Sequence, residues 1–296
     1  MVARVAAVLV LCPLLSGAQT SLDQILARLA EEAEAFSRIA PLVLSEETLV
    51  QRVSRAPSLL RPREKASQGR SPGLGFQSRE IVSEYGFSTF ADSPNVLHEI
   101  RQVLSVDGKQ VRSREPGRLR LSLGSGARDD RVKRRLLKEF EDIGLTSAVV
   151  DLGQLLLLFT GRRLADYEFE LSGRGALPPE RALILEYRQV SGHGAVTVFE
   201  GRNARREPIQ GEVWVRECDG LPLRIVIFTV RGQAGHRLQN EATVDYRMSP
   251  HGALLPEAAS HREYLDGRLE TESVSRYAPF RRFSSESQIK FEDVKE

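Results

Sequence analysis

The chain has 296 residues, of which 41% are hydrophobic, and its 42 Lys and Arg residues nearly balance its 40 Asp and Glu residues. This apolar content excludes a chain too polar to fold, and the length suits one large domain or two small ones. The formal net charge of +2 gives no reason to expect a nucleic-acid partner.

Residues 1–18 have the pattern of a secretory signal peptide. Arg4 precedes an apolar run, Val5–Leu15, and the small residues Ser16, Gly17 and Ala18 follow it. The run is too short to span a bilayer, which takes about 20 apolar residues. We therefore expect cleavage near Ala18, a periplasmic or secreted mature chain, and a single domain over residues 19–296.

The mature chain keeps one cysteine, Cys218, so the sequence predicts no disulfide within it. Glu217 and Asp219 flank this cysteine. Their charges would raise the pKa of the thiol, which argues against a nucleophilic role.

An amphipathic helix is predicted from Ser21 to Ile39. Ser21 and Gln24 have the spacing of a capping box, in which each side chain binds a free backbone N–H of the other. Pro41 ends the helix, and a strand is predicted over Leu42–Val53.

Arg55–Ser78 is predicted to be a flexible basic insertion. Its Pro and Gly residues break secondary structure, and its basic residues outnumber its one acid, Glu64. The segment is interpreted as a solvated loop, because no aromatic residues are interleaved with the charges. The alternative is a contact with another envelope protein or an anionic membrane surface. The basic residues are Arg55, Arg61, Arg63, Lys65 and Arg70.

Three Asp-Gly pairs lie between predicted strands. Asp-Gly favours a type I′ hairpin turn, because both central residues of that turn need positive φ. The pairs therefore predict an antiparallel sheet built from consecutive hairpins. They are Asp107-Gly108, Asp219-Gly220 and Asp266-Gly267.

Two helices are predicted in mid-chain. The first starts at Asp129 or Asp130 and ends at Gly144, a residue that suits a C-cap. The second runs from about Thr146 to Phe159 and is apolar around nearly its whole circumference. Such a helix must be buried on all sides or must line an apolar cavity.

The other segments are predicted to be strands. Alternation is clearest in Glu241–Met248, which predicts one buried and one solvent-facing side. Leu221–Val230 is apolar on both faces and is expected to be a central, covered strand. The further predicted strands are Arg79–Phe90, Val96–Val106, one ending near Arg114, Asp166–Leu171, Leu183–Val190, Ala195–Glu200, Gly211–Cys218, Leu254–Leu265, Arg268–Tyr277 and Ser287–Val294.

No catalytic motif is found. The five histidines show no metal-ligand spacing, and there is no GxSxG elbow, P-loop or GxGxxG. Carboxylates such as Glu168, Glu170 and Glu186 could serve acid–base work, but on alternating strands they are interpreted as a solvent-facing side. We therefore expect a non-enzymatic protein with no cofactor and no metal site.

The layout and two short motifs resemble the LolA/LolB-like periplasmic lipoprotein-carrier fold. Gly211-Glu212-Val213-Trp214-Val215 followed by Leu221-Pro222-Leu223-Arg224-Ile225 is similar to its recurrent hairpin, and the ending 277–283, YAPFRRF, is similar to uncharacterised exported proteins of this architecture. The resemblance implies an α+β, mostly β fold: a large curved antiparallel sheet, or incomplete barrel, closed by the N-terminal helix and two mid-chain helices over an apolar cavity.

The leading hypothesis is an exported protein that binds a hydrophobic ligand, such as an acyl chain, a lipid or a lipoprotein anchor, in the concave face of this sheet. A ligand site needs apolar walls with few polar groups. The alternative is an interaction or sensor module for another envelope protein, with no small ligand. In place of lining a cavity, the same apolar side chains could simply pack against one another. The third hypothesis is a hydrolase, in which His and carboxylate side chains would have to converge from distant strands. The expected cavity lining is Leu152, Leu156 and Phe159 from the second mid-chain helix, with Trp214 and Phe228 from the sheet.

Overall fold

The computed structural model of the chain describes residues 21–54, 76–114, 121, 130–145, 151–192, 196–200, 203–233 and 235–282. The predicted signal peptide, residues 55–75 of the basic insertion and the strand predicted at Ser287–Val294 lie outside these residues. Phe76–Ser78 were expected to end the insertion, but they begin strand β2. The Arg52 guanidinium lies 5.0 Å from the centre of the Phe76 ring, which holds this strand end against β1.

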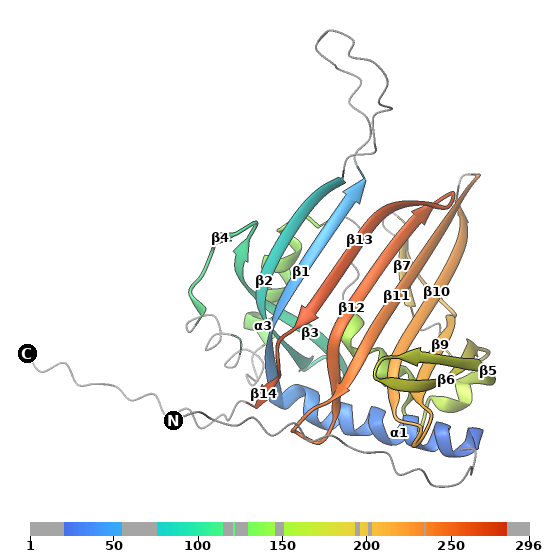
Figure 1. Cartoon of the computed structure of the whole chain (residues 1–296). Coiled ribbons are helices and arrows are strands. Elements are labelled where there is room, and N and C mark those ends of the chain that lie inside the picture. The colour runs from blue at the N-terminus through green and yellow to red at the C-terminus, as the bar shows by residue number, and fades with distance from the viewer. Residues whose placement is uncertain are drawn as a thin grey trace, which may run out of the picture.

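The described residues form one large open sheet with helices packed against it (Figure 1). The elements in chain order are α1 (Leu22–Ile39), η1 (Ala40–Leu42), β1 (Val43–Ser54), β2 (Phe76–Phe90), β3 (Ser93–Val106), β4 (Lys109–Gln110), α3 (Asp130–Glu141), η2 (Leu152–Phe159), η3 (Leu164–Asp166), β5 (Tyr167–Leu177), β6 (Glu180–Gln189), β7 (Val196–Glu200), β8 (Asn203–Glu207), β9 (Gln210–Arg216), β10 (Pro222–Gln233), β11 (His236–Met248), β12 (Leu254–Leu265), β13 (Arg268–Tyr277) and β14 (Arg281–Arg282).

The main sheet has 12 strands in the order β4-β3-β2-β1-β13-β12-β11-β10-β9-β6-β5, and β14 pairs with β1 beside this path. All of its described pairs are antiparallel. The end strands β4 and β5 do not pair with each other, so the sheet is curved but not closed into a barrel. The fold class predicted from the sequence is thus confirmed. β7 and β8 form a separate two-stranded sheet.

Two of the three Asp-Gly turns have the predicted backbone. Asp107 and Asp266 have φ near 51°, and the glycine that follows each also has positive φ. The hairpin predicted at Asp219-Gly220 is present, since β9 pairs antiparallel with β10, but its turn is not type I′, because only Gly220 has positive φ there. The Asp219 carboxylate accepts hydrogen bonds from the Arg216 side chain at 2.6 and 2.8 Å and from the Leu221 N–H at 3.2 Å, which supports a longer connection between β9 and β10.

Helix α1 begins as the sequence predicts. The Ser21 Oγ accepts from the Gln24 N–H, and the Gln24 side chain accepts from the Ser21 N–H. Its apolar stripe is buried against the sheet and η2, and α1 lies across the lower ends of the strands in Figure 1. The face of the sheet that α1 and η2 cover is called the inner face, and the opposite face the outer face.

The second mid-chain helix is shorter and tighter than predicted. Residues 146–150 lie outside the described residues, and Leu152–Phe159 forms a 3-10 helix instead of an α-helix. Asp151 before it has φ 66°, and Gln154 inside it has non-helical angles. The backbone N–H groups of Gly153 and Leu156 donate to side chains of the sheet, Glu99 and Tyr246, which draws the segment away from regular α-helical hydrogen bonding.

Helix α3 packs at the β1–β3 end of the sheet. Leu136 lies in a buried cluster with Leu44 and Ile100, and Phe140 lies in a second cluster with Leu49 and Ile81. The β1–β3 end of the sheet thus has buried clusters of its own.

Candidate functional site

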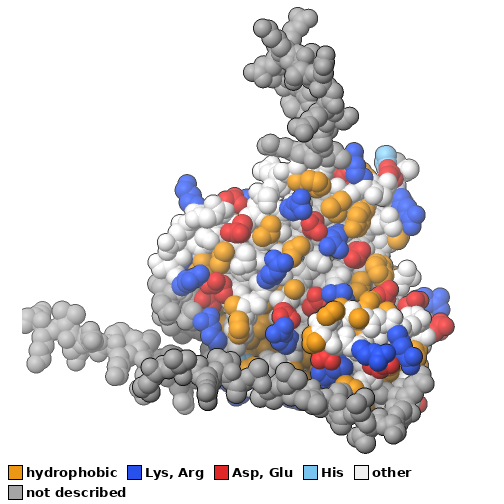
Figure 2. All heavy atoms as spheres, in the orientation of Figure 1, with side chains coloured by type: hydrophobic (Ala, Val, Ile, Leu, Met, Phe, Trp, Pro, Cys, Tyr) orange, Lys and Arg blue, Asp and Glu red, His pale blue; other side chains and the backbone are white. Residues whose placement is uncertain are grey.

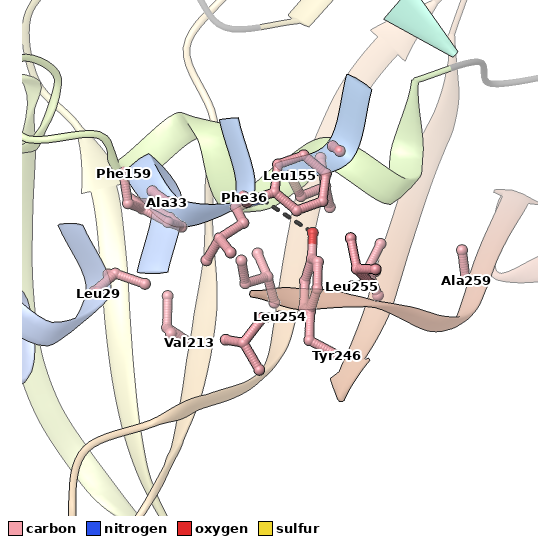
Figure 3. Packing of buried hydrophobic residues seen from close by; sticks show 14 of the residues in the cluster. Leu29, Ala33, Phe36, Leu155, Phe159, Val213, Tyr246, Leu254, Leu255 and Ala259 are labelled. Carbon is pink, nitrogen blue, oxygen red and sulfur yellow. Dashed lines mark hydrogen bonds between the residues drawn. The ribbon is translucent and has the colours of Figure 1, made fainter. Parts of the chain in front are cut away.

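A continuous apolar cluster lies between α1, η2 and the inner face of the sheet (Figure 3). Leu29, Ala33 and Phe36 come from α1, Leu155, Leu156 and Phe159 from η2, and Val213, Tyr246 and Leu254 from the strands. The Phe159 ring stands edge-on to the rings of Tyr167 and Tyr187, with centroids 5.3 and 5.0 Å apart. Aromatic pairs in this geometry stabilise each other beyond their area burial.

The protein's own side chains fill the space between η2 and the sheet. A gap of about 20 Å³ remains beside Leu152, Arg101 and Tyr277, which is room for about one water molecule. The expected apolar cavity is therefore not open in the structure, and the side chains of η2 occupy the place that a ligand would take.

The structure separates the five predicted lining residues. Leu156 and Phe159 are fully buried in the inner cluster, and Leu152 packs against it. Trp214 and Phe228 point to the outer face, because Val213 and Val215 of β9 and Ile225 and Ile227 of β10 take the inner positions. Strand alternation puts neighbouring residues on opposite faces. A contact of any of the five with a ligand stays a prediction.

Polar contacts attach η2 to the sheet. The Gly153 N–H donates to Glu99 Oε1 at 2.5 Å. The Tyr246 hydroxyl accepts from the Leu156 N–H at 3.0 Å and donates to the Gly153 carbonyl at 3.2 Å. The Asp151 carboxylate accepts from the Glu99 N–H at 2.8 Å. These bonds fix where the leucines of η2 enter the cluster.

Glu99, which binds the η2 backbone, is itself part of a buried ionic network. The Arg101 guanidinium donates to Glu47 at 2.5 and 3.0 Å and to Glu99 at 2.7 Å, and the Ser275 hydroxyl donates to Glu47 at 2.8 Å. Burial raises the pKa of the Glu99 carboxyl, against the lowering effect of Arg101. Burial alone would lower the pKa of Arg101, but Glu47 and Glu99 raise it well above its usual value.

Sequence reasoning missed Glu47, Glu99, Arg101 and Tyr246 as site residues. Glu99 and Arg101 flank the buried Ile100 in β3. Two charged residues on either side of a core residue indicate a buried ionic network when both faces of the strand are covered. The identity of their partners depends on strand order, which the sequence pattern did not contain.

Phe228 lines a groove on the outer face, where β10 meets β9, β6 and β5. The groove has a volume of about 780 Å³. Its other lining residues are Glu168, Phe169, Glu170, Glu186, Tyr187, Arg188, Gln210, Gly211 and Glu212.

Cys218 is disulfide-bonded in the structure. The sequence-based expectation concerned a disulfide within residues 19–296, which contain no second cysteine, and it stays a prediction. Among the described residues, no group of three or more His, Cys, Asp or Glu side chains is placed to hold a metal ion. None of the helices described is long and apolar enough to cross a membrane.

No protein-family model and no curated protein matches the sequence. Similar solved structures include a LolA superfamily protein from Nitrosomonas europaea, with a TM-score of 0.36 and 10% identity over 90% of this chain and 95% of that chain. A DUF1329 family protein from Desulfovibrio piger has a TM-score of 0.35 and 11% identity over 90% of this chain and 97% of that chain. A putative outer membrane lipoprotein-sorting protein domain from Vibrio parahaemolyticus has a TM-score of 0.31 and 12% identity over 88% of this chain and 95% of that chain. LolA-like proteins are thus among the similar structures, as the motifs predicted, and no residue role is transferred from them.

Proposed function

We propose that the protein is an exported, non-enzymatic carrier that binds one hydrophobic chain, such as an acyl chain or a lipoprotein anchor, on the inner face of its sheet. The observation that supports this most is the burial of η2. A short, irregular segment places Leu155, Leu156 and Phe159 where an external apolar chain would lie. Binding is then an exchange of η2 for the ligand, and no open cavity is needed beforehand.

The energies of the two occupants are of similar size. Complete burial of a Leu or Phe side chain is worth about 1.5–3 kcal/mol, so the three side chains of η2 contribute about 5–9 kcal/mol. An acyl chain gains about 0.8 kcal/mol for each buried CH₂, so ten CH₂ groups supply about 8 kcal/mol. Exchange is therefore near balance for a long acyl chain and unfavourable for a short one.

Gly153 gives a way to shift this balance. A Cβ at this residue would lie 2.5 Å from the Tyr85 hydroxyl oxygen and 2.9 Å from Glu99 Oε1. Gly153→Ala therefore pushes the start of η2 away from the sheet without changing any apolar side chain. Gly232→Ala in β10 is the matched control, because no atom lies within 4 Å of a Cβ there.

The test is a titration with fluorescent fatty acids of increasing chain length. We expect the wild-type protein to bind long chains and not short ones, and Gly153→Ala to bind them about tenfold more tightly, which corresponds to about 1.4 kcal/mol. Gly232→Ala should match the wild type. Absence of binding to both the wild type and Gly153→Ala, or an affinity that does not depend on chain length, would overturn the proposal.

Export is part of the same proposal. We expect the exported chain to begin at Gln19, as the small residues before it predict. Intact mass spectrometry of the chain recovered from outside the cytoplasm measures this directly, and a chain that keeps Met1–Ala18 there contradicts it.

A further inference from the structure

Three glutamates form a row across the outer face at the β5 end of the sheet. Glu170 on β5 is directly opposite Glu186 on β6, and Glu186 is directly opposite Glu212 on β9. The Cβ atoms of such cross-strand partners lie about 4.5–5.5 Å apart, and like charges at this distance are destabilising. A cation placed over the row would remove that cost.

The described residues do not supply this cation. The Trp214 Nε1–H donates to Glu212 at 2.7 Å but carries no charge. The nearby Arg188 pairs with Glu168 at 2.6 Å, outside the row. No basic side chain among the described residues forms an ion pair with Glu170, Glu186 or Glu212. The row is also not arranged as a metal site, because no group of described acidic or histidine side chains is placed to hold an ion.

The row forms part of the outer-face groove of about 780 Å³, which also contains the Phe228 side chain. Phe169 borders the groove, but its ring packs on Phe159 and Tyr187 on the inner face. This volume is within the range of about 300–1,000 Å³ that is typical of ligand pockets. The groove therefore combines negative charge with aromatic surface, which fits a partner that carries both cationic and apolar groups. Part of this face is seen in Figure 2, where charged and apolar side chains interleave over the strands.

The groove adjoins an unpaired strand edge. β5 is the last strand of the sheet, and within the described residues it pairs with β6 alone. Most of its side chains are exposed, and Leu171 is 41% exposed. The free N–H and C=O groups of such an edge are a template for an added strand.

Charged residues on edge strands often serve only to prevent aggregation. That explanation fits Glu168 and Glu170, which lie on β5 itself. It does not fit Glu186 and Glu212, because they lie one and two strands inside the edge, where the backbone is already paired and cannot nucleate aggregation. The row extends inward along the groove, as a binding surface does.

The geometry points to a docking site for an extended peptide segment of a partner protein that carries Lys or Arg at alternate positions. The segment adds as a strand to the β5 edge, where residues at i and i+2 share one face. Glu168 and Glu170 are spaced in the same way, so alternate cations all face the carboxylates. This site is on the opposite face from η2 and is independent of hydrophobic-ligand binding.

The test uses fluorescence anisotropy with two labelled peptides of equal composition. One alternates Lys and Val, and the other has all its lysines in one block. We expect the alternating peptide to bind at least tenfold more tightly and its affinity to fall with added salt. Glu186→Gln should weaken it about two- to fivefold, as for the loss of one exposed ion pair. Glu257→Gln, at an exposed glutamate of β12, is the control and should have no effect.

Two outcomes would overturn the inference. Equal binding of both peptides, or no effect of Glu186→Gln, would mean non-specific attraction. Self-association of Glu186→Gln without a change in peptide affinity would mean that the row is only a guard. A third probe, a peptide of residues 55–75, contains Arg61, Arg63 and Lys65 at alternate positions. If this peptide alone binds, the occupant is a second copy of the chain and not a partner protein.

Discussion

The two faces of the sheet each carry an arginine between two glutamates, and the two arrangements differ in their surroundings. On the inner face, Arg101 bridges Glu47 and Glu99, and all three side chains are buried. On the outer face, Arg262 contacts Glu272 at 2.9 Å and Glu241 at 3.5 Å, and its own side chain is 37% exposed. Water screens the outer group, whereas each member of the inner group depends on the others for its charge.

The largest expected effect comes from breaking the inner group. Arg101→Met keeps most of the side-chain volume but leaves two buried carboxylates without a cation, which should lower the free energy of unfolding by about 3–5 kcal/mol. Arg262→Met should lower it by only about 0–1 kcal/mol. Urea unfolding of both variants measures the difference, and similar losses would mean that the inner network is not desolvated.

A smaller effect is expected from the apolar side chains of the two faces. Leu156→Ala removes a side chain that is 0% exposed in the inner cluster, and should cost about 2–5 kcal/mol. Leu171→Ala, on the exposed edge strand β5, should change the free energy of unfolding by no more than about 0.5 kcal/mol. A long-chain fatty acid should restore much of the stability lost in Leu156→Ala if η2 and the ligand share one place. An equal loss in both variants contradicts the assignment of the core to the inner face.

The smallest effect is a pH dependence of the inner face. His261 is 3% exposed, and burial lowers its pKa to about 4, below the usual 6.5. The unfolded chain therefore binds a proton more readily between these values. The stabilisation is fully present above pH 6.5 and is lost as the pH falls towards 4, by about 3 kcal/mol in total.

His261→Gln should flatten this dependence, and His236→Gln, at an exposed histidine of β11, should keep it. Urea midpoints at pH 7, 6 and 5 measure it. The raised pKa of Glu99 acts with the opposite sign, because its protonated form is favoured in the folded state and its contribution is lost as the pH rises. The contribution of Glu99 is the same in His261→Gln and His236→Gln, so the difference between their pH dependences comes from His261 alone. Identical slopes would show that His261 is not the titrating group.

Local sequence signals predicted the elements that depend on few neighbours. The capping box at Ser21 and Gln24 and the turns at Asp107 and Asp266 are determined by residues within three or four positions, and all are confirmed. The antiparallel sheet followed from the repeated hairpins, and its curvature was implied only by the family resemblance. The form of η2 did not follow, because Glu99 and Tyr246, which bind its backbone, lie 54 and 90 positions from their partners in the sequence.

The candidate site was predictable only in part. The burial of Leu156 and Phe159 followed from the apolar pattern, but the pattern left open whether they line a space or fill one. Trp214 lies on the face opposite Leu156 and Phe159, and its buried neighbours Val213 and Val215 already indicated this alternation. The row of glutamates needs the register of β5, β6 and β9, which only the folded sheet supplies.

The pairing of β1 with β13, in which Glu47 stands opposite Tyr277, joins the first strand of the chain to one of the last. During synthesis, β1 emerges long before its neighbour exists, so this edge stays open until translation is almost finished. Such distant pairings make folding slow. A chain that stops before Arg268 exposes β1 and β12 together, and both become points where other chains attach. Formation of the β12–β13 hairpin therefore covers the open edges of β1 and β12 and prevents other copies of the chain from pairing with them.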